Sequence, residues 1–367
     1  MIQKLSKGKI YIFSGAVHFR IEKGKVLAIG KEVRPPEEIS IPWGKKIPLE
    51  IPEDAEIDLR IGENGFVARQ DPPNRRAVPQ DWDEFVQRSI RERPKRITVF
   101  GEIDTGKTFL ATYLANKLFK EKVKIAILDC DVGQSDIGPP GTIGLAVLEE
   151  PVVFLSALKP SAIHFVGDYS PASVLPDYFS GMKKLAEKGL SLSEILIVDT
   201  PGWVHGEEGQ RFTLNELEML TPEVAVLLER DKELDYLAQA YPEERIVRLP
   251  VSKEVLPRNP NQRRNLRELL SKKYFKEAKE MVFSLDEIST ERVHLEGKNQ
   301  ISEEGLVVGL LNGERDCLSL GIIRKIDYGE RKMYIFTPLE KKEEIKIVQF
   351  GLVYLNPDGS EKINAYP

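Results

Sequence analysis

The first 70 residues alternate apolar and polar positions in short stretches that end at turn-forming residues. The alternation is clearest over Lys9–Phe13, Ala16–Ile21 and Lys25–Ile29, and glycines separate one stretch from the next. Five prolines between positions 35 and 52 then interrupt the chain. Period-two alternation broken by glycine and proline is typical of short antiparallel strands. We therefore predict a small β domain, followed by a linker over residues 71–79.

The middle of the chain has a different pattern. Asp81–Glu92 repeats apolar residues at helical spacing, with Trp82, Phe85, Val86 and Ile90 on one face. Short continuous apolar runs, separated by helix-length segments, then predict strands at Ile97–Phe100, Val123–Leu128, Val152–Leu155, Ile195–Val198, Val224–Leu228 and Ile246–Leu249. Continuous runs of this kind are typical of a parallel sheet that helices cover on both faces.

Strand-like patterns return near residue 286. The predicted strands are Leu306–Leu310, Cys317–Lys325, Met333–Thr337, Ile345–Phe350 and Leu352–Leu355, with glycines at their edges. The sequence thus predicts three regions: an N-terminal β domain over 1–75, an α/β domain over 76–285 and a C-terminal β-rich domain over 286–367.

The composition of the chain excludes several classes of protein. The chain has 367 residues, which is long for a single core, and its 41% hydrophobic content is ordinary for a folded protein. Two cysteines exclude a disulfide scaffold, and a net charge of −5 argues against a surface that binds nucleic acid everywhere. No apolar run approaches the about 20 residues that span a bilayer, and the start lacks a signal-peptide pattern. We expect a soluble intracellular protein without a membrane partner, in which a local basic patch holds any polyanion.

The strongest chemical signal is Gly101-Glu-Ile-Asp-Thr-Gly-Lys-Thr108, a complete G-x-x-x-x-G-K-[ST] loop between a predicted strand and helix Phe109–Lys120. Its glycines allow backbone N–H groups to surround phosphate oxygens at a helix N-terminus. Lys107 would supply charge to the β- and γ-phosphates, and the Thr108 hydroxyl would bind Mg²⁺. The predicted cofactor-binding residues are Gly101, Glu102, Ile103, Asp104, Thr105, Gly106, Lys107, Thr108 and Phe109.

This loop makes the predicted fold class α/β: a P-loop NTPase core with a mostly parallel sheet, flanked by N-terminal and C-terminal small β-rich domains. An ordinary strand–helix turn is the simpler alternative, and the strand–loop–helix context disfavours it.

Two acids follow the next predicted strand. Asp129 and Asp131 are two residues apart, so on a strand both side chains would face the same side of the sheet. They lie at the strand's carboxyl end, where open α/β sheets bind their ligands. One could hold Mg²⁺ and the other could orient or deprotonate an attacking group. The alternative is a pair of turn-forming or helix-capping aspartates.

Strand Ile195–Val198 continues into Asp199-Thr-Pro-Gly-Trp203, which has two interpretations. Asp-x-x-Gly at a strand end is what a GTPase uses to sense a γ-phosphate, whereas an exposed Trp203 could stack on a nucleobase. A GTPase should also carry an Asn-Lys-x-Asp guanine reader, and the nearest candidate, Ser252-Lys-Glu254, lacks the needed acid. Trp203 could equally be a partly buried anchor.

Residues 258–283 are predicted to form a helix, with Asn259 as its N-cap and Pro260 in its first turn. Over 258–276 this segment carries seven basic residues against one acid, Glu268. The basic residues are Arg258, Arg263, Arg264, Arg267, Lys272, Lys273 and Lys276. Such a face could clamp a transferring phosphoryl group or bind the backbone phosphates of a strand. An ordinary solvated helix face is the alternative.

Together these motifs resemble the polynucleotide 5′-hydroxyl kinase family of RNA processing, which includes archaeal kinases and the ATP-binding subunit of the eukaryotic pre-mRNA cleavage machinery. The family's phosphate loop, its D-V-G-Q motif at Asp131–Gln134 and its T-x-G-W clasp at Thr200–Trp203 are present. Its lid spacing, R-x₄-R-R-x₂-R, fits Arg258, Arg263, Arg264 and Arg267. Gly167–Pro171 is similar to its G-x-x-[ST]-P substrate stretch, and the resemblance covers about 81–355.

The resemblance implies ATP- and Mg²⁺-dependent phosphorylation of 5′-hydroxyl ends of RNA, DNA or both, with RNA-processing proteins as further partners. It implies catalytic roles for Asp131, Lys107, Arg263, Arg267 and Gln134. It implies metal ligation by Thr108, Asp129 and Asp131. It implies substrate contacts from Trp203, Thr200, Ser170, Arg258 and Arg264.

Two other functions stay open at this point. Some members of the family use ATP as a structural component of a larger complex, so a non-catalytic ATP-binding scaffold is the first alternative. A P-loop GTPase or metallochaperone is the second, suggested by Asp199–Gly202, but the sequence lacks guanine-reading and metal-ligand motifs.

Overall fold

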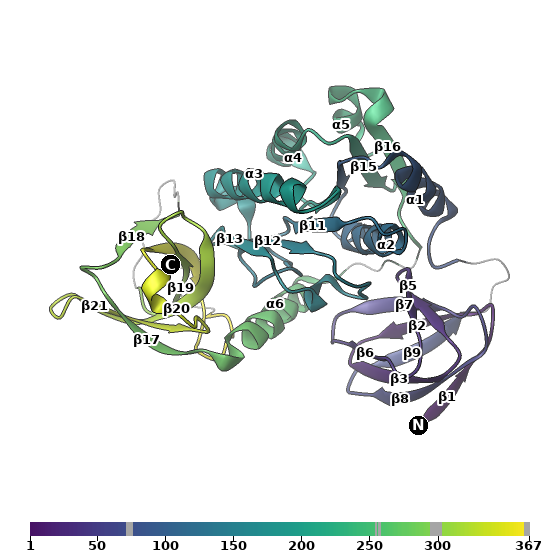
Figure 1. Ribbon diagram of the computed structural model, residues 1–367, viewed down its shortest axis with the longest axis horizontal. Helices are drawn as coiled ribbons and strands as arrows, with labels where there is room; N and C mark the ends of the chain where they lie inside the picture. The colour runs from purple at the N-terminus through teal and green to yellow at the C-terminus, as the bar shows by residue number, and fades with distance from the viewer. Residues whose placement is uncertain (71–75, 254, 256–257, 294–302, 363–367) are drawn as a thin grey trace. The chain divides into compact units, whose positions relative to one another are not determined.

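The computed structural model describes residues 1–70, 76–253, 255, 258–293 and 303–362 (Figure 1). The chain divides into two compact units. Unit 1 comprises Met1–Ile127, Leu148–Ala157 and Ser193–Arg263, and unit 2 comprises Leu128–Val147, Leu158–Leu192 and Arg264–Pro367. The three-domain division stays a prediction, and residues 71–75 of the predicted linker lie outside the described residues.

The first 70 residues of unit 1 form two antiparallel sheets, as their alternating pattern predicts. One sheet has the strand order β1-β8-β3-β6 and the other β5-β4-β7-β2-β9. Phe13 and Phe19 join the two layers, with ring centroids 4.9 Å apart and no exposed surface. The strands are β1 (Ile2–Leu5), β2 (Ile10–Ser14), β3 (Val17–Lys23), β4 (Val26–Ala28), β5 (Lys31–Val33), β6 (Glu38–Ile41), β7 (Lys46–Glu50), β8 (Ala55–Ile61) and β9 (Phe66–Gln70).

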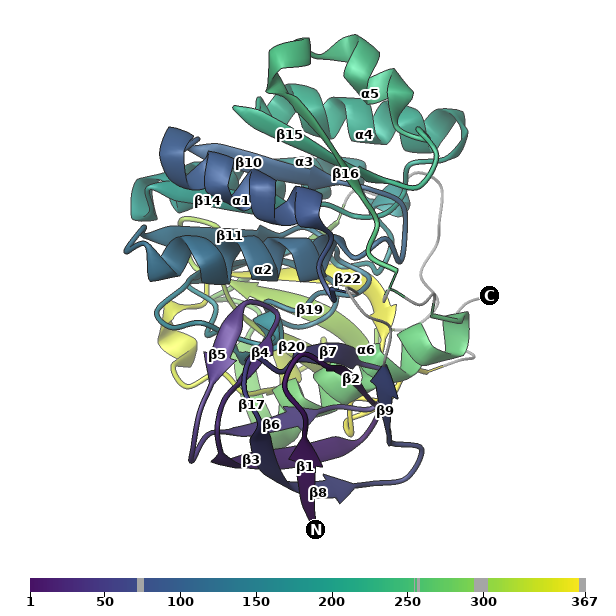
Figure 2. The same ribbon diagram turned by 90° about the vertical axis from the view of Figure 1, so that its right-hand side faces the viewer.

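The rest of unit 1 is a sheet with the strand order β16-β15-β10-β14-β11. The first three neighbouring pairs are parallel, which confirms the prediction from the buried apolar runs. α1 and α2 lie alongside this sheet (Figure 2), and α4 packs on α5. The elements are α1 (Gln80–Glu92), β10 (Arg96–Phe100), α2 (Lys107–Lys120), β11 (Ile125–Asp129), η1 (Leu155–Ala157), β14 (Ile195–Asp199), α4 (Gly206–Leu220), β15 (Val224–Glu229), α5 (Asp235–Ala240), η3 (Glu243–Arg245) and β16 (Ile246–Pro250). β11 passes into unit 2 after Ile127.

The strand predicted at Val152–Leu155 is wrong. This apolar run leads into the short helix η1 because one side chain supplies the backbone partners that a neighbouring strand would otherwise provide. The Asn116 amide donates to the Val152 carbonyl at 2.7 Å, and its oxygen accepts from the Val152 N–H at 2.9 Å.

Unit 2 contains β12 (Thr142–Val147) and β13 (Ala162–Phe165), an antiparallel pair that the apolar pattern did not predict. The strand order continues β13-β20-β19-β22-β18, with β21 between β20 and β17. α3 packs on β12 and β13. The remaining elements are η2 (Pro171–Ser173), α3 (Leu175–Leu192), η4 (Phe275–Glu277), β17 (Lys279–Ser284), β18 (Ser289–Arg292), β19 (Leu306–Leu311), β20 (Cys317–Asp327), β21 (Lys332–Thr337), η5 (Lys342–Glu344) and β22 (Ile347–Tyr354).

Two C-terminal predictions need correction. The two strands expected at Ile345–Phe350 and Leu352–Leu355 are one strand, β22, because Gly351 allows close backbone packing: a Cβ there would lie 2.7 Å from the Gly167 carbonyl oxygen. The helix expected over 258–283 is α6 (Pro260–Tyr274), which ends where the chain enters η4 and then β17. β17 pairs along its whole length with β21, and this long-range pairing leaves no local signal in the helical pattern.

α6 starts as predicted and passes from unit 1 to unit 2 after Arg263. Asn259 accepts from the Gln262 N–H at 2.9 Å, and the Gln262 side chain accepts from the Asn259 N–H at 3.0 Å. This reciprocal pair is a capping box. None of the helices in the described part of the chain combines the length and apolarity needed to cross a membrane.

Candidate active site

The phosphate loop lies between β10 and α2 in unit 1. Gly106 begins the helix at a φ of 93°, in the region that favours glycine. A Cβ there would also lie 2.9 Å from a methyl group of Val255. The glycine therefore lets the loop turn tightly into α2, so that the amide groups of the helix start are available to an anion.

Lys107 is buried, with only 7% of its surface accessible to solvent. Its ammonium donates to the Glu102 carbonyl at 2.9 Å, and the Thr105 hydroxyl donates to the same carbonyl at 2.8 Å. The two bonds close the loop on itself. The cation is thus held at the loop where phosphate oxygens bind in proteins with this motif.

Asp104 connects the phosphate loop to the predicted lid. Its carboxylate accepts from the Arg258 N–H at 2.8 Å and from a terminal nitrogen of Arg263 at 3.1 Å. Its carbonyl accepts from Arg230 at 2.8 Å, and its φ is 57°. Asp104 is therefore fixed through both its side chain and its backbone, and two of the four lid arginines, Arg258 and Arg263, contact the loop within unit 1.

The Thr108 hydroxyl donates to the Asp199 carboxylate at 2.6 Å. Asp199 ends β14, which pairs with β10, so the parallel sheet brings this acid to the phosphate loop. Asp199 is not among the metal ligands predicted from the sequence, because Asp-x-x-Gly at a strand end is interpreted there as a γ-phosphate sensor. The available signal was its place at the end of a buried strand, the same signal that singled out Asp129.

The clasp segment also lies in unit 1. A Cβ at Gly202 would lie 2.5 Å from the Ile103 amide nitrogen, so the clasp backbone packs directly on the phosphate loop. Trp203 is half-buried and its ring lies 5.2 Å from that of Phe212. Thr200 is fully buried and donates to the Val99 carbonyl at 2.9 Å, so its hydroxyl holds β14 to β10. Substrate contacts by Trp203 and Thr200 stay predictions.

Unit 2 contains the acid pair, and the two acids do not share a strand face as expected. β11 ends at Asp129, and Asp131 lies in the turn that follows. One Asp129 oxygen accepts from the Asp131 N–H at 3.1 Å, and the other accepts from the amides of Asp136 and Ile137 at 2.6 and 3.0 Å. Asp129 thereby organises the loop that carries Asp131, which is a capping role, and its metal role stays a prediction.

Asp131 and Gln134 form a tight turn. One Asp131 oxygen accepts from the N–H groups of Gly133 and Gln134 at 3.1 and 3.0 Å, and the Gln134 amide donates to the Gly133 carbonyl at 2.6 Å. Nearby, Ser170 is exposed and caps the short helix η2 by accepting from the Ala172 N–H. The carboxylate of Asp131 is thus held in one orientation by its own turn.

The other two lid arginines, Arg264 and Arg267, belong to unit 2. Both pair with Glu361, and Arg264 also pairs with Glu268 at 3.3 Å. The predicted residues thus fall into two sets. Unit 1 brings together the loop, the clasp, Arg258 and Arg263, and unit 2 holds the acid turn, Ser170, Arg264 and Arg267. The described residues contain no group of three or more His, Cys, Asp or Glu side chains able to hold a metal ion.

Residues 101–277 match the family described as mRNA cleavage and polyadenylation factor CLP1 P-loop. The polyribonucleotide 5′-hydroxyl-kinase of Pyrococcus furiosus is 30% identical over 336 residues, which cover 77% of this chain and 94% of that protein. This chain belongs to that kinase family. The protein of the same description from Pyrococcus abyssi is 29% identical over 337 residues, again 77% of this chain and 94% of the relative.

The chain also shares its fold with a solved structure. The solved structure of the wild-type Clp1p–Pcf11p complex matches with a TM-score of 0.77 at 15% identity, over 96% of this chain and 98% of that chain. The resemblance to the polynucleotide kinase family is confirmed, and so is the P-loop fold with flanking β-rich regions. Membership of a P-loop kinase family implies that the chain binds a nucleotide.

Proposed function

We propose that this chain is an ATP-dependent polynucleotide 5′-hydroxyl kinase, which transfers the γ-phosphate of ATP to the 5′-hydroxyl end of RNA, DNA or both. Its membership of the polyribonucleotide 5′-hydroxyl-kinase family supports the proposal. The structural observation that carries it is the contact between Asp104 of the phosphate loop and Arg263 of the lid helix. An arginine anchored at a phosphate loop is suited to stabilise charge on a phosphoryl group in transfer.

Mg²⁺ fits the oxygen donors of the loop. Thr108 and Asp199 supply a hydroxyl and a carboxylate within 2.6 Å of each other, and Mg²⁺ in kinases prefers one or two protein oxygens together with phosphate and water. We propose that Thr108 and Asp199 hold the ion, with Asp129 and Asp131 as the other predicted ligands. When bound, Mg²⁺ would neutralise charge on the β- and γ-phosphates.

The chain's own residues account for the remaining chemistry. Lys107 and the loop amides would bind the triphosphate. Asp131 would accept the proton of the 5′-hydroxyl as that oxygen attacks the γ-phosphorus, and ADP would leave with the electrons of the broken P–O bond. Gln134 would help to position the nucleophile or the metal ion, and Arg263 and Arg267 would stabilise the transferring group.

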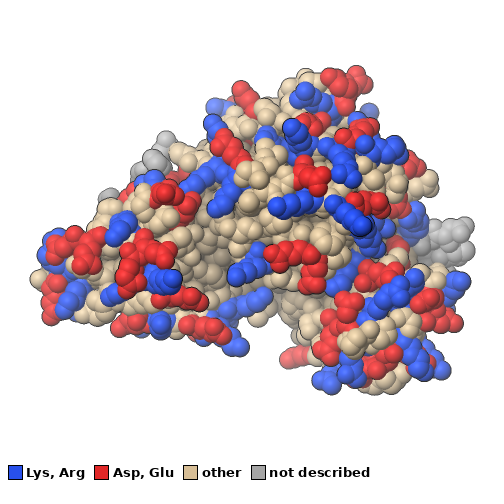
Figure 3. Space-filling view, in the orientation of Figure 1, with Lys and Arg blue, Asp and Glu red and all other residues tan. Residues whose placement is uncertain are grey.

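We expect the protein to bind only the last few nucleotides of its substrate. Acidic and basic side chains are interspersed on the face drawn in Figure 3, which suits recognition by a few residues rather than by a broad basic surface. We propose that Trp203, Thr200, Ser170, Arg258 and Arg264 contribute to this contact. Clp1p was solved in complex with Pcf11p, and RNA-processing proteins are proposed as partners here too.

The test is transfer of labelled γ-phosphate from ATP and Mg²⁺ to a short 5′-hydroxyl oligoribonucleotide and to its DNA twin. Lys107→Ala serves as the blank, and the label should appear on the oligonucleotide with wild-type protein only. The ratio of RNA to DNA labelling gives the substrate preference. ATP binding without transfer to either oligonucleotide would contradict the proposal and favour the scaffold alternative.

A further inference from the structure

Arg267 is held on two sides within unit 2. Its Nε donates to one carboxylate oxygen of Glu361 at 2.9 Å, and its guanidinium carbon lies 4.7 Å from the centre of the Tyr169 ring. Only 19% of the arginine side chain is exposed. A long side chain that is normally free to move is therefore confined by an ion pair at one edge and by an aromatic face.

Glu361 binds Arg267 at Nε, and this choice of nitrogen determines which N–H donors of the guanidinium remain available. A guanidinium has five N–H donors, and Nε carries only one of them. Among the described residues, the two terminal nitrogens of Arg267 have no hydrogen-bond partner, since its hydrogen bond to Glu361 is made by Nε and its contact with Tyr169 is with the ring. The four remaining donors form the fork that binds a phosphoryl group through two parallel hydrogen bonds.

Glu361 is itself fixed by its surroundings. Its second oxygen lies 3.4 Å from Nε of Arg264, and its N–H donates to Glu268 at 3.4 Å. The turn before it docks against α6: Gly359 has a φ of 82°, and a Cβ there would lie 2.7 Å from the Lys272 amide nitrogen. The C-terminal segment is thus built to place one carboxylate beneath two arginines of the lid helix.

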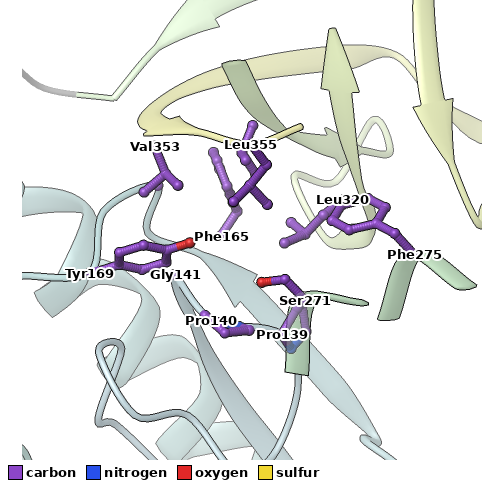
Figure 4. Close-up of a pocket in the computed structure, with 12 residues that line it drawn as sticks. Pro139, Pro140, Gly141, Phe165, Tyr169, Ser271, Phe275, Leu320, Val353 and Leu355 are labelled. Atoms are coloured by element: carbon purple, nitrogen blue, oxygen red, sulfur yellow. The ribbon is translucent and has the colours of Figure 1, made fainter. Parts of the chain in front are cut away.

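Tyr169 links this arrangement to the acid turn. A Cβ at Gly133, two residues after Asp131, would lie 2.7 Å from the Tyr169 carbonyl oxygen. Figure 4 shows Tyr169, Ser271 of α6 and Leu355 of the C-terminal segment around one small cavity. The backbone of Tyr169 therefore packs on the Asp131 turn, while its ring packs on Arg267.

We propose that Glu361 and Tyr169 are positioning residues that fix the orientation of Arg267, so that its two terminal nitrogens stay available to a phosphoryl group. The inference rests on the proposed kinase function and adds two residues outside the predicted motifs. Glu361 anchors the guanidinium at the nitrogen that a phosphate does not need, and it shares its charge with Arg264. The donors that Arg267 keeps for phosphoryl oxygens are therefore those of its two terminal nitrogens.

The first test compares transfer kinetics of Glu361→Ala with those of the wild type. We expect kcat to fall about 10- to 100-fold, because a misplaced reacting group costs up to about that factor, while KM for ATP changes less than about twofold. Glu361→Gln keeps an acceptor for Nε and should recover most of the rate. Glu343→Ala removes an exposed carboxylate of the same unit and should match the wild type.

The second test asks whether Glu361 acts through Arg267. In a background of Arg267→Ala, adding Glu361→Ala should change kcat by less than about twofold, because the two side chains form one unit. Tyr169→Leu, which removes the ring, should lower kcat about 3- to 10-fold, whereas Tyr169→Phe keeps the ring and most of the rate. Thermal unfolding of each variant identifies any loss of fold. If Glu361→Ala does not fold, the kinetics of Glu361→Gln and Tyr169→Leu test the positioning role instead.

The outcomes separate this inference from the proposed function. If the wild type transfers phosphate and Glu361→Ala does so at the same kcat, the positioning role is wrong and the kinase function stands. Equal losses from Glu361→Ala with and without Arg267 would also overturn it. If the wild type transfers no phosphate, the proposed function fails and the inference fails with it.

Discussion

The hydroxyl of Thr108, at the start of α2, donates a 2.6 Å hydrogen bond to the carboxylate of Asp199, at the end of β14. The bond exists because β10 and β14 are parallel neighbours, which places a strand end beside the phosphate loop. Asp199 is only 1% exposed, and a carboxylate buried to that degree needs a polar or cationic partner. Its position therefore favours a role at a metal ion over a role in a solvent-exposed turn.

Asp199→Asn tests this role. The variant keeps an oxygen that can accept from Thr108 but loses the negative charge. We expect transfer to fall about 10- to 100-fold and the Mg²⁺ concentration for half-maximal rate to rise. Rates measured across a Mg²⁺ titration check this, with the exposed Asp231→Asn as a control that should behave as wild type. An unaltered Mg²⁺ dependence would remove Asp199 from the metal site.

Asp131→Asn separates proton transfer from turn geometry. The Asn oxygen can still accept from the N–H groups of Gly133 and Gln134, so the turn should persist while the base is lost. We expect kcat to fall by about 10² to 10⁴, the usual contribution of a general base, with ATP affinity largely unchanged. Single-turnover transfer and ATP titration measure the two effects. Normal turnover would exclude Asp131 as the base.

Asp104→Ala should weaken ATP binding. The change removes the acceptor for the Arg258 N–H and for Arg263, and it leaves alanine at a φ of 57°. One charge-assisted hydrogen bond contributes about 1.5–3 kcal/mol, so we expect the dissociation constant for ATP to rise about tenfold or more. Calorimetric titration measures it, and Asp104→Asn should be intermediate. Glu121→Ala, at the other end of α2, serves as control. Equal ATP affinities of Asp104→Ala and the wild type would contradict a role of Asp104 in holding the two arginines at the loop.

The sequence predicts those parts of the fold that depend on interactions between residues close together in the chain. The capping box at Asn259 depends on a partner three residues away, Gln262, and the phosphate loop depends on eight consecutive residues. Parallel strands such as β10 and β15 follow from continuous apolar runs, because a strand buried on both faces has no polar side. Each of these features is determined within one short segment.

Features that depend on distant segments are not predictable in this way. Asp129 ends a buried strand, which suits a metal ligand, yet its carboxylate accepts from amides seven and eight residues further along the chain. Arg267 pairs with Glu361 across 94 residues, and no spacing rule connects them. The strand predicted at Val152 fails for the same reason, since the amide of Asn116 replaces the expected sheet neighbour.

The burial of His164 predicts that the free energy of unfolding depends on pH. It lies on β13 against α3, where a Cβ at Gly181 would come within 2.2 Å of its ring. Its buried Nε2 has no hydrogen-bond partner among the described residues. Burial, together with the positive charge of Lys184, lowers the pKa of His164 to about 4, although Asp177 opposes the shift. The imidazole is therefore neutral in the folded protein at neutral pH.

The sign of the effect follows from proton uptake on unfolding. An exposed histidine in the unfolded chain binds a proton near pH 6.5, whereas folded His164 binds one only near pH 4. Between these values the unfolded state holds the extra proton, so the free energy of unfolding falls as the pH falls, by up to about 1.4 kcal/mol per pH unit. His164→Gln removes this titration. Urea unfolding at pH 7 and pH 5 should show a smaller loss of stability in the variant than in the wild type, and equal losses would contradict a neutral buried His164.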